Sequence, residues 1–263
     1  MKADEIVNRR GTDSIKWDVA DNELPMWVAD MDFQTAPEII DALIKRAKEG
    51  VFGYTDVNDE WYDAYINWWK NRHGFEMNRE WLMFCTGVIP AISSTVRKLT
   101  TPNEKVIIQT PVYNIFFNSI LNNGCQVLES PLHYEDGIYS IDFDDLEEKM
   151  SDPQASLMIL CNPHNPVSKI WSKEELAKIG ELAKKHGVTI ISDEIHCDLT
   201  MPGKDYIPFA AHAAIIRKET GLYLSSGTVY GDCGKDFLRM NVACTKANLQ
   251  DGLSRLKKAI DSL

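Results

Sequence analysis

Short apolar runs that alternate with helix-patterned segments constrain the fold of this chain more than any other feature. The runs are WLMFCTG (81–87), KVIIQTPVY (105–113), CQVLESPL (125–132), SLMILCNPHNP (156–166) and GVTIISDEIH (187–196). Strands that alternate with helices indicate a parallel, doubly wound α/β sheet. Because ligands of such sheets bind at the carboxyl ends of the strands, the residues that follow these runs are the candidates for function.

Periodicity and capping signals predict three of the helices. Residues 37–49 begin with proline and carry one apolar face, formed by Ile39, Ile40, Leu43 and Ile44. Residues 60–72 carry an aromatic stripe typical of a core or a subunit interface, formed by Trp61, Ala64, Tyr65, Trp68 and Trp69. A capping box at Ser172 and Glu175 predicts a third helix that continues through Lys185.

The charge balance excludes several classes of function. The chain has 28 Lys and Arg residues against 39 Asp and Glu residues, a net charge of −11 that disfavours binding to nucleic acids or anionic membranes. No apolar run approaches the roughly 20 residues that span a bilayer, and the first ten residues are too charged for a secretory signal. The six cysteines form no CxxC pair, so we expect neither a zinc knuckle nor a redox motif. These features together predict a cytoplasmic protein.

Several residues at the predicted strand ends could hold a ligand. Gly87 and Val88 open a helical stretch whose backbone N–H groups could bind a phosphate, although such turns also carry glycine for backbone reasons. Tyr113 could lie against a flat heteroaromatic ring, or it could be ordinary packing. The side chain of Asn165 could donate to a ring oxygen, with flanking prolines that restrict its backbone.

Asp193 is the most informative of these residues. It directly follows the apolar run 188–192, so we expect its carboxylate at the buried end of a central strand, where an unpaired charge is costly. A protonated pyridine nitrogen would be a suitable partner, although a capping role for Asp193 is the simpler alternative. His196 could orient Asp193 or contact the ligand, and no second histidine stands at metal-ligand spacing from it.

Taken together, these segments resemble pyridoxal phosphate (PLP) enzymes of the aspartate aminotransferase fold. Within class I/II of that family the chain resembles the MalY/PatB branch of cystathionine β-lyases, also called C–S lyases. The resemblance rests on the segments NELPMWVADMDF (22–33), FGYT (52–55), TGVIPAIS (86–93), TPVYNIFF (110–117), NPHNPV (162–167), SDEIHCDL (192–199), ETGLYLSSGTVYG (219–231) and FLRMN (237–241).

The resemblance implies a fold and a set of domains. The fold would be the PLP-dependent transferase fold, with a mostly parallel, doubly wound sheet in an incomplete large domain. Residues 1–36 would form an N-terminal arm belonging to the small domain, residues 37–210 the PLP-binding large domain, and residues 211–263 a remnant of the C-terminal small domain.

The resemblance also implies roles for individual residues. Gly87 and Val88 would bind the cofactor phosphate, and Tyr113 would stack on the cofactor ring. Asn165 would donate to the ring oxygen and also face the substrate, Asp193 would pair with the ring nitrogen, and His196 would make a second contact to the ring oxygen. Tyr54 would reach the phosphate held by a neighbouring subunit, which implies a homodimer, and Arg239 would bind the α-carboxylate of an amino-acid substrate.

The chain departs from the family pattern after Asp193. Family members carry an SKTF-like turn there, whose lysine forms a Schiff base with the cofactor, and no such turn is present. The lysines that follow Asp193 stand in other contexts: Lys204, Lys218, Lys235, Lys246, Lys257 and Lys258. The simplest explanation is an internal deletion with its seam near residues 210–217, which would leave strand edges and apolar faces uncovered.

A smaller departure concerns the loop that follows NPHNPV. Ser168 occupies a position where the family usually has glycine and where the backbone is expected to adopt a positive φ.

Three functions follow as hypotheses. The first is a PLP-dependent C–S β-lyase that releases a thiol, pyruvate and ammonia, with an ordinary aminotransferase as its near neighbour. The second is a catalytically inactive relative that binds PLP noncovalently or partners a full-length subunit, because the missing lysine is both nucleophile and general base. The third, an unrelated nucleotide-binding protein, is disfavoured because neither GxGxxG nor GxxxxGK[ST] occurs.

Overall fold

The structure is a computed structural model, and it describes residues 7–28, 30–201, 203 and 206–210, together with the backbone of 225–226 and 238–239. The chain divides into two compact units, Met1–Asp56 and Val57–Leu263. The domain boundaries expected after residues 36 and 210 stay predictions, as does the seam near 210–217, of which residues 211–217 lie outside the described residues.

The first unit contains the 3₁₀ helix η1 (Ile15–Trp17) and the helix α1 (Pro37–Lys48). Asp32 organises the segment before α1, because its carboxylate accepts hydrogen bonds from Lys16 Nζ at 2.7 Å, Trp17 Nε1 at 2.8 Å and Arg9 at 2.8 Å. These donors hold the pKa of Asp32 well below its usual range, with Lys16 making the largest contribution. The helix α1 has the predicted bounds within one residue, but it buries none of its side chains.

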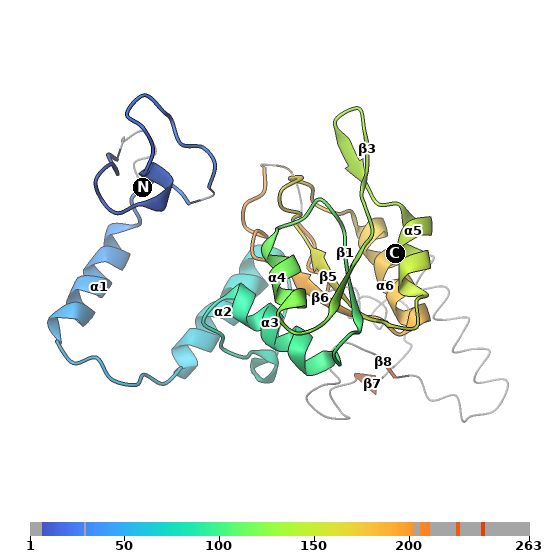
Figure 1. Cartoon of the computed structure of the whole chain (residues 1–263). Helices are drawn as coiled ribbons and strands as arrows, with labels where there is room; N and C mark the ends of the chain where they lie inside the picture. Colours follow the sequence, from blue (N-terminus) through green and yellow to red (C-terminus); the bar gives the residue numbers. More distant parts are fainter. Residues whose placement is uncertain are drawn as a thin grey trace. The chain divides into compact units, whose positions relative to one another are not determined.

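A four-stranded parallel sheet forms the centre of the second unit (Figure 1). Its strands lie in the order β2 (Gln126–Glu129), β1 (Lys105–Ile108), β5 (Ala155–Cys161) and β6 (Thr189–Asp193). Every pairing in this sheet is parallel. The structure therefore confirms the predicted α/β class, and it places a strand within four of the five apolar runs.

Helices cover both faces of this sheet (Figure 1). On one face, α3 (Val88–Leu99) and α4 (Ile115–Leu121) pack through Ile92, Val96, Phe116 and Ile120. On the other face, α5 (Phe143–Met150) and α6 (Lys173–His186) pack through Leu146, Met150, Leu176 and Ile179. The side chains of β1 and β5 alternate between these two clusters, as expected for strands that are covered on both faces.

The remaining described elements lie outside this three-layer core. The helix α2 (Asp59–His73) and the 3₁₀ helix η2 (Arg79–Trp81) precede it in sequence. The strands β3 (His133–Glu135) and β4 (Ile138–Ser140) form an antiparallel hairpin, and β7 (Ser225–Ser226) pairs with β8 (Leu238–Arg239). Among the residues that the structure describes, no helix has the length and apolarity needed to cross a membrane.

The capping signals define α6 as predicted. Ser172 Oγ accepts a hydrogen bond from the backbone N–H of Glu175 at 3.1 Å, and the Glu175 carboxylate accepts one from the backbone N–H of Ser172 at 2.7 Å. This reciprocal pair satisfies two N–H groups that the first helical turn would otherwise leave free. At the other end, Gly187 adopts a left-handed conformation with φ 73° and ends the helix one residue beyond the predicted Lys185.

Two predictions about strands are wrong. The run 81–87 forms no strand, since residues 82–87 are irregular and Met83 and Phe84 are 77% and 50% exposed. A strand needs a neighbour to bond with, and no described residue pairs with this run. The strand β6 is not central either, because it is the last strand in the order of the described sheet. Its first four residues are only half buried, whereas those of β1 and β5 are almost all buried.

The aromatic stripe of α2 does not form a core. Only Trp69 of that stripe is buried, whereas Trp61, Tyr65 and Trp68 are between 48% and 63% exposed. The interpretation as a subunit interface stays open as a prediction.

The structure confirms the positive φ expected at Ser168, which has φ 57°. A side chain costs about 1–2 kcal/mol in this left-handed region, more than the chain entropy that glycine adds to the unfolded state. We therefore expect Ser168→Gly to raise the free energy of unfolding by about 0.5–1 kcal/mol. Urea-induced unfolding followed by far-UV circular dichroism measures this change.

The control for this change is Ser94→Gly, at an exposed position inside α3. Glycine there should lower the free energy of unfolding, because a helix interior disfavours it. Equal losses in the two variants would show that the backbone at Ser168 is not strained.

Candidate active site

The carboxyl ends of β1, β5 and β6 carry four of the eight predicted site residues, Tyr113, Asn165, Asp193 and His196. Asp193 ends β6 and lies in register with Cys161, which ends β5. The backbone N–H of Asn162 donates to the backbone carbonyl of Asp193 at 2.9 Å, so the β5–β6 ladder continues to the last residue. The loop that carries Asn165 therefore starts beside Asp193.

The carboxyl group of Asp193 is a buried acid without a cation. It is 8% exposed, and its Oδ1 accepts one hydrogen bond, from the backbone N–H of Ile195 at 3.2 Å. Burial raises the pKa of Asp193 above its usual value, while the Ile195 N–H and a charged His196 lower it. No lysine, arginine or histidine in the described part of the chain forms an ion pair with this carboxylate. A positively charged ligand group would thus find a ready partner here.

Asn165 is held beside Asp193 by the thiol of Cys161. The backbone N–H of Asn165 donates to Cys161 Sγ at 3.4 Å, and the thiol lies 3.5 Å from the Pro163 carbonyl. Burial raises the pKa of Cys161 to about 12, so it stays a neutral thiol at ordinary pH. Both side chains are at least partly buried, and the loop that carries Asn165 is fixed at its first turn.

His164 connects this loop with the loop that follows β1. Its ring is 1% exposed, and its Nε2 lies 3.0 Å from the backbone carbonyl of Pro111. Because a carbonyl can only accept a hydrogen bond, Nε2 carries the proton. Burial lowers the pKa of His164, which keeps the ring neutral. This contact fixes the segment before Tyr113, whose half-exposed ring packs edge-on against Phe116 at 5.9 Å.

Trp171 supports the same loop through two hydrogen bonds. Its indole Nε1 donates to the Cys161 carbonyl at 3.0 Å, and its backbone N–H donates to the side chain of Asn162 at 3.2 Å. The His164 ring meets the indole edge-on at 5.5 Å. We did not predict His164, Cys161 or Trp171 as positioning residues. In the sequence, only their uncommon residue types, near two closely spaced prolines, indicate that they could position the loop.

Gly87 and Val88 begin α3, on the face of the sheet that also carries Cys161. The backbone at Gly87 is extended, with φ 165°, which any residue can adopt, and an added Cβ would meet only Pro90 at an ordinary 3.5 Å. Backbone geometry therefore gives no reason for glycine at this position. The N-cap residue Gly87 makes no side-chain hydrogen bond to the first turn of α3, and the phosphate-binding role of Gly87 and Val88 stays a prediction.

Two predicted residues are not joined to this site by the structure. Tyr54 belongs to the first unit, where its side chain is fully exposed. Arg239 lies in β8, and its side chain is outside the described residues. The predicted roles of both residues stay predictions.

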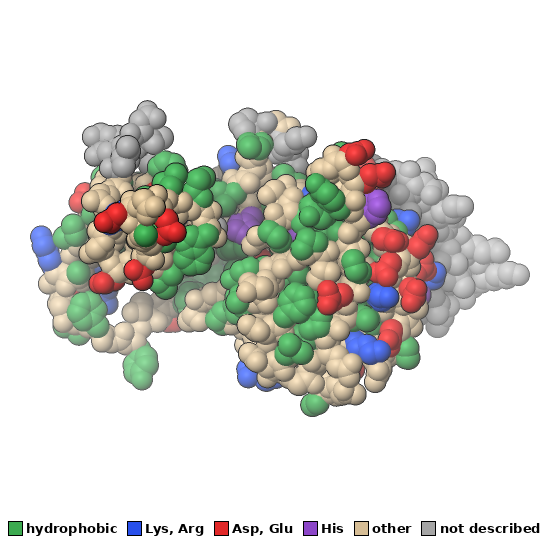
Figure 2. Space-filling model, turned by 45° about the horizontal axis from the view of Figure 1, so that its top comes forward, with side chains coloured by type: hydrophobic (Ala, Val, Ile, Leu, Met, Phe, Trp, Pro, Cys, Tyr) green, Lys and Arg blue, Asp and Glu red, His purple; other side chains and the backbone are tan. Residues whose placement is uncertain are grey.

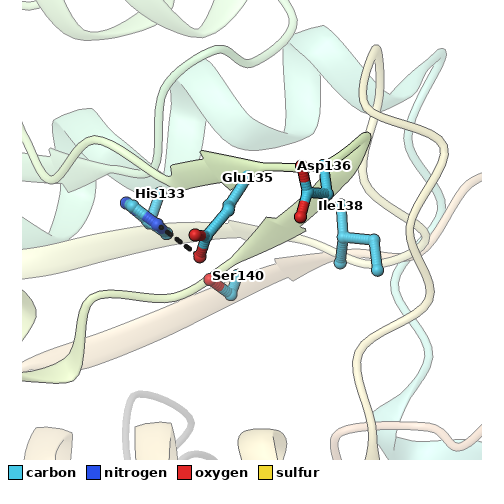
Figure 3. Close-up of a pocket in the computed structure, with 5 residues that line it drawn as sticks. All are labelled: His133, Glu135, Asp136, Ile138 and Ser140. Carbon is cyan, nitrogen blue, oxygen red and sulfur yellow. Dashed lines mark ion pairs between the residues drawn. The ribbon is translucent and has the colours of Figure 1, made fainter.

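A shallow hollow of about 250 Å³ lies on the β3–β4 hairpin (Figure 3). It is lined by His133, Glu135, Asp136, Ile138 and Ser140, and His133 Nε2 lies 3.5 Å from the Glu135 carboxylate. The side chains of His133 and Glu135 are 61% and 77% exposed. Because none of the predicted site residues lines this hollow and its polar groups are solvated, we do not assign it to the active site.

Comparison with known proteins identifies similar sequences and folds. Residues 22–215 match the family model of aminotransferase class I and II. The chain is 46% identical to cystathionine beta-lyase PatB of Bacillus subtilis over 80% of this chain and 56% of PatB. It is 36% identical to protein MalY of Escherichia coli over 78% of this chain and 55% of MalY.

A similar solved structure is the PLP-bound C–S lyase from Staphylococcus hominis. Its TM-score is 0.75 at 38% sequence identity, with 79% of this chain and 54% of that chain covered. The chain therefore spans about half the length of the curated relatives it matches.

Proposed function

Because the chain belongs to the aminotransferase class I and II family, we propose that it binds pyridoxal 5′-phosphate at the edge formed by β1, β5 and β6. The observation that carries this proposal is the buried Asp193 carboxylate, which has no cationic partner among the described residues. A protonated pyridine nitrogen fits this carboxylate, and the N-terminus of α3 fits a phosphate. PLP, when bound to an amino acid, acts as an electron sink for bond cleavage at the α- and β-carbons.

Each residue of the site has a separate task in this proposal. Asp193 keeps the ring nitrogen protonated. The Asn165 amide donates to the ring oxygen from a backbone that Cys161 and His164 fix. Tyr113 covers one face of the ring and excludes water from it. The backbone N–H groups at Gly87 and Val88 bind the phosphate, and Arg239 binds the substrate carboxylate through its planar guanidinium.

We propose a PLP-dependent C–S lyase as the reaction of the complete protein. Relatives named cystathionine beta-lyase and a solved C–S lyase support this class over an ordinary aminotransferase. The substrates would be cystathionine or other amino acids with a sulfur atom on the β-carbon. Elimination breaks the bond between that carbon and sulfur and releases the thiol, and addition of one water to the remaining aminoacrylate yields pyruvate and ammonia.

A second candidate is a noncatalytic relative that binds PLP without a covalent bond. It is favoured by one feature of the chain, the absence of a lysine in the family context after Asp193. We further propose that an internal deletion near residues 210–217 removed that lysine. The position of β6 at the edge of the described sheet and the irregular run 82–87 support this, since no described strand pairs with the outer edge of β6 or with that run.

One set of assays distinguishes these functions. The full chain is first titrated with PLP, and the bound complex is tested for pyruvate release from cystathionine and for transamination of a keto acid. Pyruvate release supports the lyase, and keto-acid-dependent transamination supports the aminotransferase. The noncatalytic candidate is supported if PLP binds, borohydride does not attach it covalently to the protein, and neither pyruvate nor a transamination product forms. No PLP binding at all contradicts every one of these proposals.

We also propose a homodimer as the native assembly. The apolar face of α1 is exposed within the described structure, with Ile39, Ile40, Leu43 and Ile44 between 39% and 64% accessible. Apolar side chains of both units are visible on the surface in Figure 2. Because isolated soluble proteins rarely expose such faces, a second subunit is the expected cover. Tyr54 would then reach the phosphate bound by that subunit.

A charge on α1 tests this assembly. We expect Leu43→Glu to convert a dimer into a monomer in sedimentation velocity, because a buried carboxylate without a partner is costly. The control is Lys45→Glu on the same helix, which should leave the dimer intact because Lys45 lies outside the apolar stripe. A dimer that persists in Leu43→Glu would exclude this face from the interface.

A further inference from the structure

The end of α2 and the loop after β6 bring together three side chains of metal-binding type that the proposed function does not use. These are His73, Cys197 and Asp198, and one donor atom from each lies within 4.8 Å of the other two. His73 lies more than a hundred positions before the adjacent Cys197 and Asp198 in sequence, and all three belong to the second unit.

The surrounding contacts already hold these donors in place. The His73 side chain is 5% exposed, and its ring packs against Trp69 at 4.8 Å and Tyr206 at 5.3 Å. Cys197 is 8% exposed in the same small cluster of apolar residues. The Asp198 carboxylate accepts a hydrogen bond from Trp68 Nε1 at 2.9 Å through one oxygen, and its other oxygen lies 2.9 Å from His73 Nε2.

We propose that His73, Cys197 and Asp198 bind a divalent transition-metal ion of the Zn²⁺ type, with a fourth position open to water. A thiolate, an imidazole and a carboxylate together match Zn²⁺ and disfavour Mg²⁺ and Ca²⁺, which prefer oxygen ligands. Donors on one tetrahedral zinc lie roughly 3.3–3.8 Å apart, as follows from bond lengths of about 2.0–2.3 Å. Two donor atoms at the 4.8 Å limit would need to approach each other by about 1–1.5 Å. His73 Nε2 and Asp198 Oδ1, which lie 2.9 Å apart, would need to separate by about 0.5 Å.

The charges around the cluster favour a cation. Burial, together with the negative charges of Asp198 and Glu194, raises the pKa of Cys197 to about 11. Glu194 is itself largely buried, and burial raises its pKa too. Tyr65 and Tyr206 also lie beside Cys197 and Glu194. Both tyrosines are neutral at pH 7, because burial raises their pKa values.

Among the described residues, Arg72 is a positive charge beside the cluster that opposes a metal ion. Its Nε lies 3.5 Å from Asp198 Oδ1, but its side chain is 56% exposed and can turn to solvent. A net positive charge entering the cluster would thus replace an exposed ion pair, which contributes little to stability.

The chemistry of binding supplies a specific signature. Without metal the Cys197 sulfur carries its proton, so Zn²⁺ binding forms the Zn–S bond, breaks the S–H bond and releases one proton to the buffer. An ordinary ion pair between His73 and Asp198 involves no sulfur and releases no such proton.

Titration of the full chain with Co²⁺, without added PLP, tests the proposal directly. We expect a near-ultraviolet band from thiolate-to-cobalt charge transfer and visible bands typical of tetrahedral cobalt, both displaced by Zn²⁺. Calorimetric titration with Zn²⁺ in two buffers of different ionisation enthalpy should report one proton released at pH 7. Cys197→Ser should lose the charge-transfer band and the proton, whereas Cys85→Ser, which removes an exposed thiol, should retain both.

The wild-type chain alone can overturn the proposal, because absence of the charge-transfer band excludes a thiolate ligand. A band that persists in Cys197→Ser, or that is lost in Cys85→Ser, overturns it as well. If Cys197→Ser loses its near-ultraviolet circular dichroism, His73→Gln is used instead. Glutamine can still hydrogen-bond to Asp198, and we expect it to weaken Zn²⁺ binding at least tenfold, whereas unchanged affinity would contradict the site.

Discussion

Replacement of Asp193 by asparagine is expected to weaken the binding of PLP while making the unloaded chain more stable. Asparagine has the same shape, but it cannot pair as an anion with a protonated ring nitrogen. A hydrogen bond to a charged group contributes about 1.5–3 kcal/mol, so affinity should fall roughly tenfold to a hundredfold. Absorbance titration with PLP measures this loss.

The opposite effect on stability follows from burial. The pKa of Asp193 is raised in the folded chain, mainly by burial, so the folded state holds its proton more tightly than the unfolded state. The stability that this group contributes is therefore fully present below its unfolded pKa and is lost as the pH rises through the folded value. The asparagine introduced by Asp193→Asn has no such proton, so the variant should lose less stability than the wild type between pH 4 and pH 7.

Urea-induced unfolding at several pH values measures this difference. The free energy of unfolding of the variant should still decrease with rising pH, but less steeply than that of the wild type, because burial also raises the pKa of Glu194. The control is Asp136→Asn on the exposed hairpin, which should change neither PLP affinity nor the pH dependence. An Asp193→Asn variant that is less stable than the wild type at pH 7 would show that the carboxylate has a structural partner.

Replacement of Trp171 by alanine is the change expected to damage the fold most. The side chain is 1% exposed and belongs to the core cluster that packs against α6. Its indole N–H also donates a hydrogen bond to the Cys161 carbonyl. Removal of such a side chain costs about 3–5 kcal/mol, a large part of the roughly 5–15 kcal/mol that stabilises a typical domain. We expect early unfolding in urea and loss of PLP binding, because the loop that carries Asn165 loses its support.

Two further variants separate packing from hydrogen bonding. Trp171→Phe keeps an aromatic ring but leaves the Cys161 carbonyl unpaired, so its cost should be clearly smaller than that of alanine. Trp81→Ala removes an indole that is 49% exposed and should cost less than about 1 kcal/mol. Equal losses in Trp171→Ala and Trp81→Ala would contradict the assigned core.

The sequence predicted well the elements that depend on local signals. The strands β1, β5 and β6 follow from compact apolar runs, and the start of α6 follows from its capping box. The positive φ at Ser168 was also predicted correctly, since it depends on one residue in a family turn.

The errors concern structure that depends on distant partners. The run 82–87 has the composition of a strand, but strand formation needs an adjacent chain, which composition does not reveal. The wrong prediction that β6 is a central strand has the same cause. Likewise, the stripe on α2 has helical periodicity, but periodicity alone does not tell a core from an exposed face.

For the candidate site too, local sequence signals indicate some residues and contacts between distant residues determine the others. Asp193 and Asn165 are predicted from the sequence because they stand at strand ends, where ligands bind in this class of fold. The contact between His164 and Pro111 joins residues more than fifty positions apart, and no local pattern indicates it. The structure thus adds the buried supports of the site, and it leaves the roles of Tyr54 and Arg239 as predictions.

The protonation state of bound PLP tests the central claim most directly. The full chain is loaded with PLP labelled with ¹⁵N in the ring, and the ¹⁵N chemical shift is compared with that of the Asp193→Asn variant, loaded at saturating PLP. We expect the shift of a protonated pyridine nitrogen at neutral pH in the wild type and that of an unprotonated nitrogen in the variant. An unprotonated ring in the wild type, or the same shift in both proteins, would contradict the pairing of Asp193 with the cofactor.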